Sequence, residues 1–318
     1  MKKKQEKIES TDHGGMLKDI RIIFCIIFLV EFAFLLRERS SNDLEQLKAD
    51  NVSKICFITA IFGSYEASCK RFAEQSVPTD FICFTDNANI TSNGWTIDTL
   101  PYHILSRSKL DKSTYTNSMK KNQHTFNIAK YYKQAFINIP RLHQYDTIIW
   151  LDGSIEITYN KTSEYILSKI QDKKIIGWHH ERRFGSLDSE VTASNISRYT
   201  SQRWNGQLQP LQDVRKQYEY YIKKGYRESY FEEKESHTPH FGVWVTCFVA
   251  FLQHDKEVQQ FLDLWYLQTL KFTTQDQVGF SYAAQSLNML PYTLPNDEIH
   301  GNEPHQKTMF YVKHDHGS

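Results

Sequence analysis

A buried strand that ends in a polar turn constrains this chain more than any other stretch of its sequence. Residues 147–151 read TIIWL, a run of β-branched and aromatic side chains, and Asp152-Gly153-Ser154 follows at once. Such a run is typical of a strand covered on both faces of a sheet. Ligands of open α/β sheets bind at the carboxyl ends of strands. The Asp152 carboxylate is therefore the first candidate for a binding site, although Asp-Gly is also a common turn pair.

Further strands and amphipathic helices alternate along the chain. Strand-like runs begin at Ile55, Asp80, Gly94, Lys174 and Val243, and helix-like patterns cover residues 117–138, 212–224, 258–270 and 278–287. Strands that alternate with helices favour an α/β fold, with a mostly parallel central sheet flanked by helices. With 318 residues and 40% hydrophobic content, the chain can bury one large core or two modest ones. Its net charge of +1 gives no reason to expect a nucleic-acid partner.

An apolar segment near the N-terminus predicts membrane attachment. Residues 22–36 read IIFCIIFLVEFAFLL behind a lysine-rich tail. A full crossing takes about 20 residues, and Glu31 within this run is costly in lipid. A buried soluble helix would lack the basic tail, and a cleaved signal peptide needs small residues before its cut site. We therefore expect a cytosolic tail at 1–20, a transmembrane signal anchor at 21–37, a stem at 38–53 and a catalytic domain at 54–318.

This topology is that of a single-pass type II protein of the Golgi or endoplasmic reticulum membrane, with its catalytic domain in the lumen. Sequons for N-glycosylation agree with that location and stand at Asn51, Asn89, Asn160 and Asn195. Cysteines beyond the anchor, which allow up to two disulfides, are Cys56, Cys69, Cys83 and Cys247. Cys56 and Cys83 lie in strand-like runs and equally suit small buried apolar positions.

Three aspartates stand where expected elements end or begin. Asp86 ends the second strand, Asp152 the central one, and Asp276 begins a helix. Transfer from a nucleotide diphosphate needs such groups for the base or ribose, for the pyrophosphate and for the sugar or acceptor hydroxyl. In that chemistry Asp152, with Ser154 and His316, would hold a divalent metal, and Lys313 would add positive charge. Taken singly, each aspartate also suits an ordinary turn or helix cap.

Several blocks of sequence resemble one family in a fixed order. They are TAIFG from Thr59, ICFTDN from Ile82, NIAKYYK from Asn127, IIWLDGSIEI from Ile148 and TTQDQVGF from Thr273. Together they resemble a glycosyltransferase-like family, formerly a domain of unknown function, known from mucilage-related and ceramidase-named plant proteins and from algal and microbial sequences. More distantly, LDGS is similar to the D-x-D motif of GT-A glycosyltransferases. The terminal KHDHG is similar to the metal-binding His-Gly element of glycogenin-like enzymes.

The resemblance implies a GT-A-like, Rossmann-like fold, a nucleotide-sugar donor and a glycan or glycoprotein acceptor. The residue chemistry and the resemblance together give these candidate residues: catalytic, Asp276 and Gln277; donor-binding, Thr59, Asp86, Lys130, Lys133, Asp152, Arg182 and Lys313; metal-binding, Asp152, Ser154 and His316. The expected reaction is transfer of a hexose or pentose in the secretory pathway.

One departure from the motif affects the metal. Ser154 stands where D-x-D has its second acid, so Asp152 is the only charged ligand in this loop. An imidazole from His316 suits Mn²⁺ better than Mg²⁺, and a metal-independent site with Lys313, Arg182 and Arg183 as counter-charge is the other option. Two further readings stay open. A ceramidase-like lipid amidase would need a zinc or Ser/His site, and the Ser154 substitution fits an inactive glycan-binding module.

Overall fold

The computed structural model describes most of the chain after residue 52. Described are residues 53–63, 65–105, 125–179, 186–197, 203–204, 207–208, 214–234, 242–272, 275–294 and 311–314. The chain divides into two compact units, Met1–Val52 and Ser53–Ser318, and the described residues all belong to the second. The expected tail, the anchor and most of the stem therefore lie outside them. Within the described part, no helix combines the length and apolar character that a membrane crossing needs.

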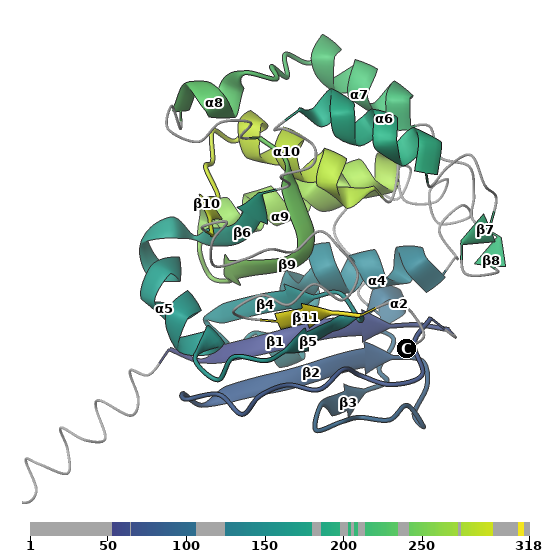
Figure 1. Ribbon diagram of the computed structural model, residues 1–318, viewed down its shortest axis with the longest axis vertical. Coiled ribbons are helices and arrows are strands. Elements are labelled where there is room, and N and C mark those ends of the chain that lie inside the picture. The colour runs from purple at the N-terminus through teal and green to yellow at the C-terminus, as the bar shows by residue number, and fades with distance from the viewer. Residues whose placement is uncertain are drawn as a thin grey trace, which may run out of the picture. The chain divides into compact units, whose positions relative to one another are not determined.

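A seven-stranded sheet forms the centre of the second unit, in the order β10-β6-β9-β4-β1-β2-β3 (Figure 1). Its strands are β1 (Ile55–Ile61), β2 (Thr79–Thr85), β3 (Thr96–Asp98), β4 (Thr147–Leu151), β6 (Ile175–His179), β9 (Trp244–Leu252) and β10 (Tyr292–Thr293). β1 pairs in parallel with β2 and β4, as do β2 with β3 and β6 with β10. β9 runs antiparallel to both β4 and β6. The expected mostly parallel sheet is confirmed, with one reversed strand next to the central one.

Two short antiparallel ribbons accompany this sheet. One pairs β5 (Ile155–Ile157) with β11 (Tyr311–Lys313), and the other pairs β7 (Arg203–Trp204) with β8 (Gln207–Leu208). β5 begins one residue after Ser154, so the first ribbon extends directly from the loop that follows β4. It brings the C-terminal end of the chain beside that loop.

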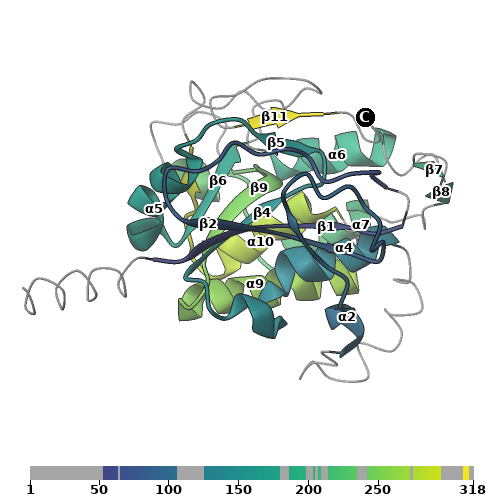
Figure 2. The same ribbon diagram turned by 90° about the horizontal axis from the view of Figure 1, so that it is seen from below.

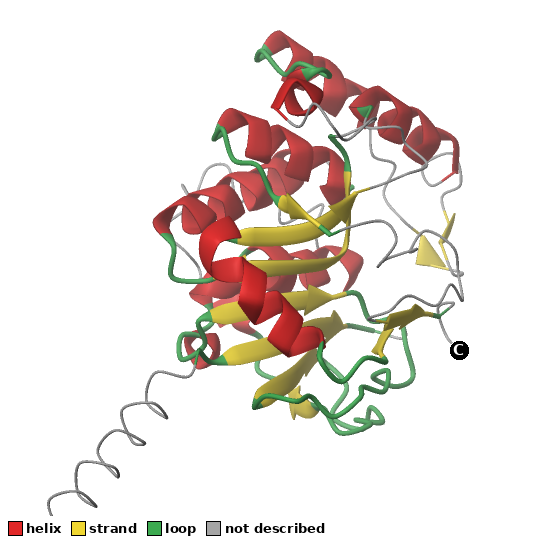
Figure 3. Cartoon of the chain, turned by 60° about the vertical axis from the view of Figure 1, so that its left-hand side comes forward, coloured by secondary structure: helices red, strands yellow, loops and turns green. Residues whose placement is uncertain are grey.

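Helices cover both faces of the sheet. They are α2 (Tyr102–Leu105), α4 (Thr125–Gln134), α5 (Thr162–Lys173), α6 (Leu187–Ser197), α7 (Val214–Lys223), α8 (Tyr230–Lys234), α9 (Lys256–Lys271) and α10 (Asp276–Ser286), with 3₁₀ turns at Phe136–Asn138 and Pro140–Leu142. Figure 2 shows α4 and α9 on one side of the sheet and the β5–β11 ribbon on the other. Figure 3 shows α5 across the face opposite to that of α4 and α9.

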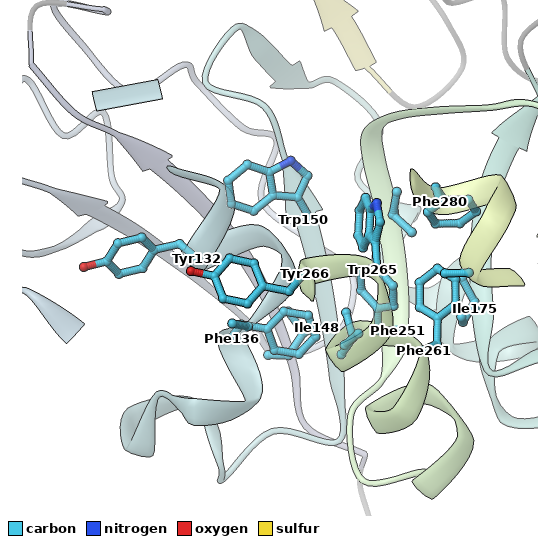
Figure 4. Close-up of a cluster of buried hydrophobic side chains, with 14 of the residues drawn as sticks. Tyr132, Phe136, Ile148, Trp150, Ile175, Phe251, Phe261, Trp265, Tyr266 and Phe280 are labelled. Atoms are coloured by element: carbon cyan, nitrogen blue, oxygen red, sulfur yellow. The ribbon is translucent and has the colours of Figure 1, made fainter. Parts of the chain in front are cut away.

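The alternation of side chains along the strands builds a separate core on each face. In β1, Cys56 and Ile58 belong to the core under α4, α9 and α10, whereas Phe57 and Ile61 belong to the core under α5. A strand buried on both faces has no polar side to show, which explains its continuous apolar sequence. In β4 the same alternation directs Ile148 and Trp150 toward α4 and α9 (Figure 4).

The cysteines and sequons of the described chain can be placed directly. Cys56, Cys69, Cys83 and Cys247 are buried free thiols in this structure. Asn89 and Asn160 are exposed in turns, and Asn195 lies in the last turn of α6. Asn51 lies outside the described residues.

Candidate functional site

Three loops meet at one edge of the sheet. Because β1, β2 and β4 are mutually parallel, their carboxyl ends lie at the same edge, where Gly63, Asp86 and Asp152 follow them. The amino-terminal part of β9 enters the same edge, and the Asp152 backbone N–H donates to the Cys247 carbonyl at 2.9 Å. This edge is where an open α/β sheet binds ligands.

The Asp152 carboxylate is held through one of its two oxygens. Trp150 lies two residues earlier, on the same face of the chain, and its Nε1 donates to Asp152 Oδ1 at 2.8 Å. Lys133 Nζ lies 3.5 Å from the same oxygen, and 39% of the Asp152 side chain is exposed. Among the described residues, Asp152 Oδ2 has no hydrogen-bond partner. The side chain is therefore oriented by the protein while one oxygen stays open to a ligand.

A buried network of opposite charges lies behind Asp152. Lys130 and Lys133 are three positions apart in α4 and so share one face of the helix. Both ammonium groups contact Asp276 Oδ2, at 2.8 Å from Lys130 and 2.5 Å from Lys133. Lys133 also donates to the Thr246 hydroxyl at 3.1 Å. Two carboxylates and two ammonium groups thus balance in charge at the first turn of α10, where an acid is favourable to the helix dipole.

The pKa values of this network reflect that balance. Burial alone would raise the pKa of Asp276, but Lys130 and Lys133 outweigh burial and hold it well below its usual range. Burial would also raise the pKa of Asp152. Lys133 and Lys130 outweigh burial there too, so the pKa of Asp152 lies below its ordinary value. Burial lowers the pKa of Lys130, which Asp276 only partly offsets. For Lys133 the attraction of Asp152 and Asp276 exceeds the effect of burial, so its pKa is raised.

Two tryptophans flank Lys133. Its Nζ lies 5.5 Å from the centre of the Trp150 ring and 5.8 Å from that of Trp265, within the range of cation–π attraction. Figure 4 shows both indole nitrogens directed to the same side of the apolar cluster. On that side Trp150 bonds to Asp152, and Trp265 Nε1 donates to the Asp276 carbonyl at 2.7 Å. The hydrophobic core thus ends in a polar layer at the candidate site.

A chain of buried polar groups continues from α10 toward α6. Gln275 Nε2 donates to Glu190 Oε1 at 2.5 Å and to Gln277 Oε1 at 3.0 Å. Ser194, one turn after Glu190 in α6, donates its hydroxyl to the same carboxylate at 3.0 Å. All four side chains are buried.

Asp86 belongs to the same edge but has a different partner. Its carboxylate accepts from the Gly63 N–H, with the two oxygens at 2.9 and 3.2 Å. Gly63 has φ of +66°, a conformation that favours glycine. His103 lies nearby, where burial lowers its pKa and Asp86 partly opposes that effect. The His103 ring also packs edge-on to Phe62, which gives this part of the site an aromatic wall.

The C-terminal segment closes onto the loop after β4. The His314 backbone N–H donates to the Ser154 carbonyl at 2.9 Å, and its Nε2 lies 2.7 Å from Glu156 Oε2. Ser154 is fully buried, and its Oγ has no hydrogen-bond partner among the described residues. At Gly153 a Cβ atom would lie 3.1 Å from Ile61 Cγ1, so the close approach of the loop to β1 favours glycine.

These positions bear on the expected metal. Asp152 Oδ2 and the orphaned Ser154 Oγ are two oxygen ligands of the kind that divalent cations take, with water completing the shell. The part of the chain that the structure describes contains no cluster of three or more His, Cys, Asp or Glu side chains suited to a metal. His316 and Arg182 lie outside the described residues, as does the Lys313 side chain.

The structure unites some of the expected site residues and separates others. Lys130, Lys133, Asp152 and Asp276 form one network of ion pairs, and Gln277 follows Asp276 directly in α10 but bonds to Gln275 instead. Thr59 is buried between Phe57 and Ile61, residues of the core on the opposite face, and its hydroxyl has no partner among the described residues.

Sequence reasoning missed four contributors: Trp150, Glu190, Thr246 and Gln275. Trp150 had a usable signal, because residues two apart in a strand share a face. Glu190 had none, since a glutamate in a polar helix is ordinarily solvated.

Comparisons with known proteins give fold likenesses at low identity. No family model matches the chain, and no curated protein matches it. Among solved structures it is similar to the WbbM bifunctional glycosyltransferase, with 9% identity and a TM-score of 0.39 over 77% of this chain and 39% of that one. It is similar to mouse xyloside xylosyltransferase 1, with 9% identity and a TM-score of 0.39 over 76% of this chain and 84% of that one. It is also similar to core-mannan synthase A of Aspergillus fumigatus in a Mn/GDP form, with 8% identity and a TM-score of 0.34 over 74% and 70%.

This chain therefore spans well under half of the WbbM chain. All three TM-scores lie below 0.5, so these likenesses assign neither an activity nor a substrate to it.

Proposed function

We propose that this chain is a glycosyltransferase that moves a hexose or pentose from a nucleotide-sugar donor to a glycan or glycoprotein. The observation that carries the proposal is the Asp152 carboxylate at the carboxyl edge of the sheet. One oxygen is fixed by Trp150 and Lys133, the other is open, and an orphaned hydroxyl stands two residues on. An oriented carboxylate beside buried positive charge suits the recognition of a diphosphate and its counter-ion.

We assign each residue a role according to its position at this edge of the sheet. Asp86 and the aromatic wall at His103 lie where the nucleotide would bind, at the ends of β1 and β2. Asp152 lies where the diphosphate would bind, with Arg182 and Lys313 as additional positive charges. Lys130 and Lys133 act through the carboxylates that they hold, because both ammonium groups are buried against Asp276. Asp276 and Gln277, at the start of α10, face the transferred sugar and the acceptor.

A divalent cation, Mn²⁺ rather than Mg²⁺, would be held by Asp152, Ser154 and His316. When bound it would neutralise the negative charge that develops on the departing nucleoside diphosphate. The structure supports this assignment through the open Asp152 oxygen, the unsatisfied Ser154 hydroxyl and the return of β11 to this loop. With water completing the shell, a single charged ligand in the loop is sufficient for a weak site.

We further propose that the enzyme is a single-pass type II protein of the Golgi or endoplasmic reticulum, anchored by residues 21–37. Asn89 and Asn160 lie in exposed turns, so a glycan at either position would meet no buried surface.

A thermal-shift panel tests the function directly. A ligand that binds only the native state raises Tm by mass action, and at 100 times its Kd it adds about 2.7 kcal/mol. We expect UDP- or GDP-linked sugars to raise Tm, and Mn²⁺ to increase that shift. A panel in which no nucleotide sugar shifts Tm, with or without Mn²⁺, contradicts the proposal. Stabilisation by free glycans without any response to nucleotides would instead indicate a glycan-binding module.

A further inference from the structure

The three side chains Glu190, Gln275 and Gln277 form a hydrogen-bond relay with a fixed direction. An ionised carboxylate can only accept, so Gln275 must present its NH₂ group to Glu190. The second hydrogen of that same NH₂ group is donated to Gln277 Oε1 at 3.0 Å. Amide oxygen and nitrogen are assigned from such networks, and here the carboxylate at one end determines both amides in turn.

The relay determines which end of the Gln277 amide is free to bind a ligand. Its carbonyl oxygen is occupied by Gln275, and among the described residues its Nε2 bonds to no protein group. Gln277 is the second residue of α10, next to the Asp276 that contacts both lysines behind Asp152. Gln277 can therefore offer two N–H donors at the candidate site, while its carbonyl oxygen is held by Gln275.

We propose that Glu190 is a positioning residue that fixes the Gln277 amide with its NH₂ group toward the transferred sugar. The Gln277 amide then recognises a hydroxyl oxygen of that sugar as a hydrogen-bond acceptor. This inference rests on the proposed glycosyltransferase function. It adds a group that contacts the sugar of the donor and not its nucleotide. A site built to hydrogen-bond a substrate hydroxyl discriminates strongly against analogues that lack it, because its buried polar group is left unpaired.

The Glu190→Gln variant tests the direction of the hydrogen bonds without changing the packing of the side chain. The variant keeps the size of the side chain and can still hydrogen bond to Gln275 and Ser194. It can present either an oxygen or an NH₂ group, so the orientation of the two downstream amides is no longer determined. Glu228→Gln is the matched control, because Glu228 accepts from the Leu187 N–H at 2.8 Å at the start of the same helix but does not bond to Gln275.

The experiment measures the affinity that the sugar adds to the nucleotide. Titration calorimetry compares UDP with UDP-glucose, UDP-galactose and UDP-xylose, and GDP with GDP-mannose, for the wild-type protein, E190Q, Q277A and E228Q. For the preferred donor we expect E190Q and Q277A to lose about tenfold in affinity, or about 1.4 kcal/mol, with the Kd of the free nucleotide diphosphate unchanged. E228Q should behave as the wild type.

Deoxy-sugar donors identify the hydroxyl. Removing the one that Gln277 contacts should weaken binding to the wild type and leave E190Q unaffected. Equal sugar contributions in wild type and E190Q overturn the relay while leaving the proposed function intact. Failure of the wild type to bind any nucleotide or nucleotide sugar overturns the proposed function instead.

The relay can also be tested in the protein alone, without a nucleotide sugar. In ¹⁵N NMR of the glutamine side chains, both Gln275 amide protons should exchange slowly with solvent, and E190Q should speed that exchange. Fast exchange in the wild type contradicts the relay itself.

Discussion

Lys133 carries the most concentrated set of interactions in the candidate site. Its side chain is 1% exposed, and its ammonium group contacts Asp276 and Asp152 and lies near two indole rings. Removing one partner of a buried ion pair leaves an uncompensated charge and costs about 3–5 kcal/mol. We expect Lys133→Met to lower the free energy of unfolding by about that amount, measured by urea denaturation.

Lys174 supplies the control for Lys133. It also pairs with two carboxylates, Asp255 at 3.2 Å and Glu257 at 2.7 Å, but at the surface. Solvent screens such pairs, so Lys174→Met should have a much smaller effect. Equal destabilisation by the two substitutions would show that the buried ion pairs of Lys133 stabilise the fold no more than the surface ion pairs of Lys174.

The lowered pKa of Asp276 predicts a pH dependence of folding. A carboxyl group whose folded pKa lies below its unfolded value stabilises the fold above the unfolded pKa and loses that contribution as pH falls toward the folded one. With an ordinary value of 3.8, the contribution of Asp276 should be complete at neutral pH and decline below about pH 4. The difference in unfolding free energy between wild type and Asp276→Asn should therefore be largest near pH 7 and shrink in acid. A difference that is constant from pH 7 to pH 3 would refute the ion-paired state.

The residues of the candidate site differ in how far the sequence alone indicates them. Asp152 can be singled out from the sequence because it directly follows a buried strand, although Asp-Gly equally suits an ordinary turn. Its partner Lys133 is visible only as one of several lysines in an amphipathic segment, since the contact depends on how α4 packs on the sheet. Glu190 and Gln275 meet across a gap of 85 positions, which no local pattern encodes.

At the scale of elements, strand identity was predictable and strand direction was not. Runs such as β1, β4 and β9 are apolar on both faces, so each predicts a buried strand. The same property removes any marker of direction, and the antiparallel course of β9 follows from its tertiary neighbours. α5 and α6 were missed because each buries only a narrow apolar stripe, as Ile166 and Ile170 do in α5. β11 gains its strand conformation from pairing with β5.

Two truncations separate the structural and functional contributions of the C-terminal segment. Ending the chain after Lys313 keeps β11 but removes His314 and His316. Ending it after Phe310 also removes the strand that pairs with β5. We expect the first truncation to lower Tm only slightly, because His314 loses its hydrogen bonds to Ser154 and Glu156, and to lose the Mn²⁺-dependent part of nucleotide binding. The second should in addition lower Tm by a few degrees, because β5 loses its backbone partners. Full Mn²⁺ response after the first truncation would exclude a ligand beyond Lys313.

At the scale of the whole molecule, the two cores explain why the polar groups collect at one edge. Apolar side chains fill both faces of the sheet, so charged groups are accommodated where the strands end. At that edge the core under α4, α9 and α10 presents the indole nitrogen of Trp150 to the Asp152 carboxylate and that of Trp265 to the backbone carbonyl of Asp276. The Asp152 carboxylate and the start of α10 are therefore held in place by the core before any ligand binds.

The proposed type II topology makes a prediction about the body of the chain as a separate unit. Residues 53–318 form their own compact unit, so a body expressed from Ser53 behind a cleavable secretion signal should fold with the Tm of the full-length protein. In secreting cells Asn89→Gln and Asn160→Gln should each remove one glycosidase-sensitive shift in gel mobility, since both asparagines are exposed. In microsomes, the body of the full-length chain should resist added protease until the membrane is dissolved. Mobility that no glycosidase changes, together with digestion of the body in intact microsomes, would place the body in the cytosol.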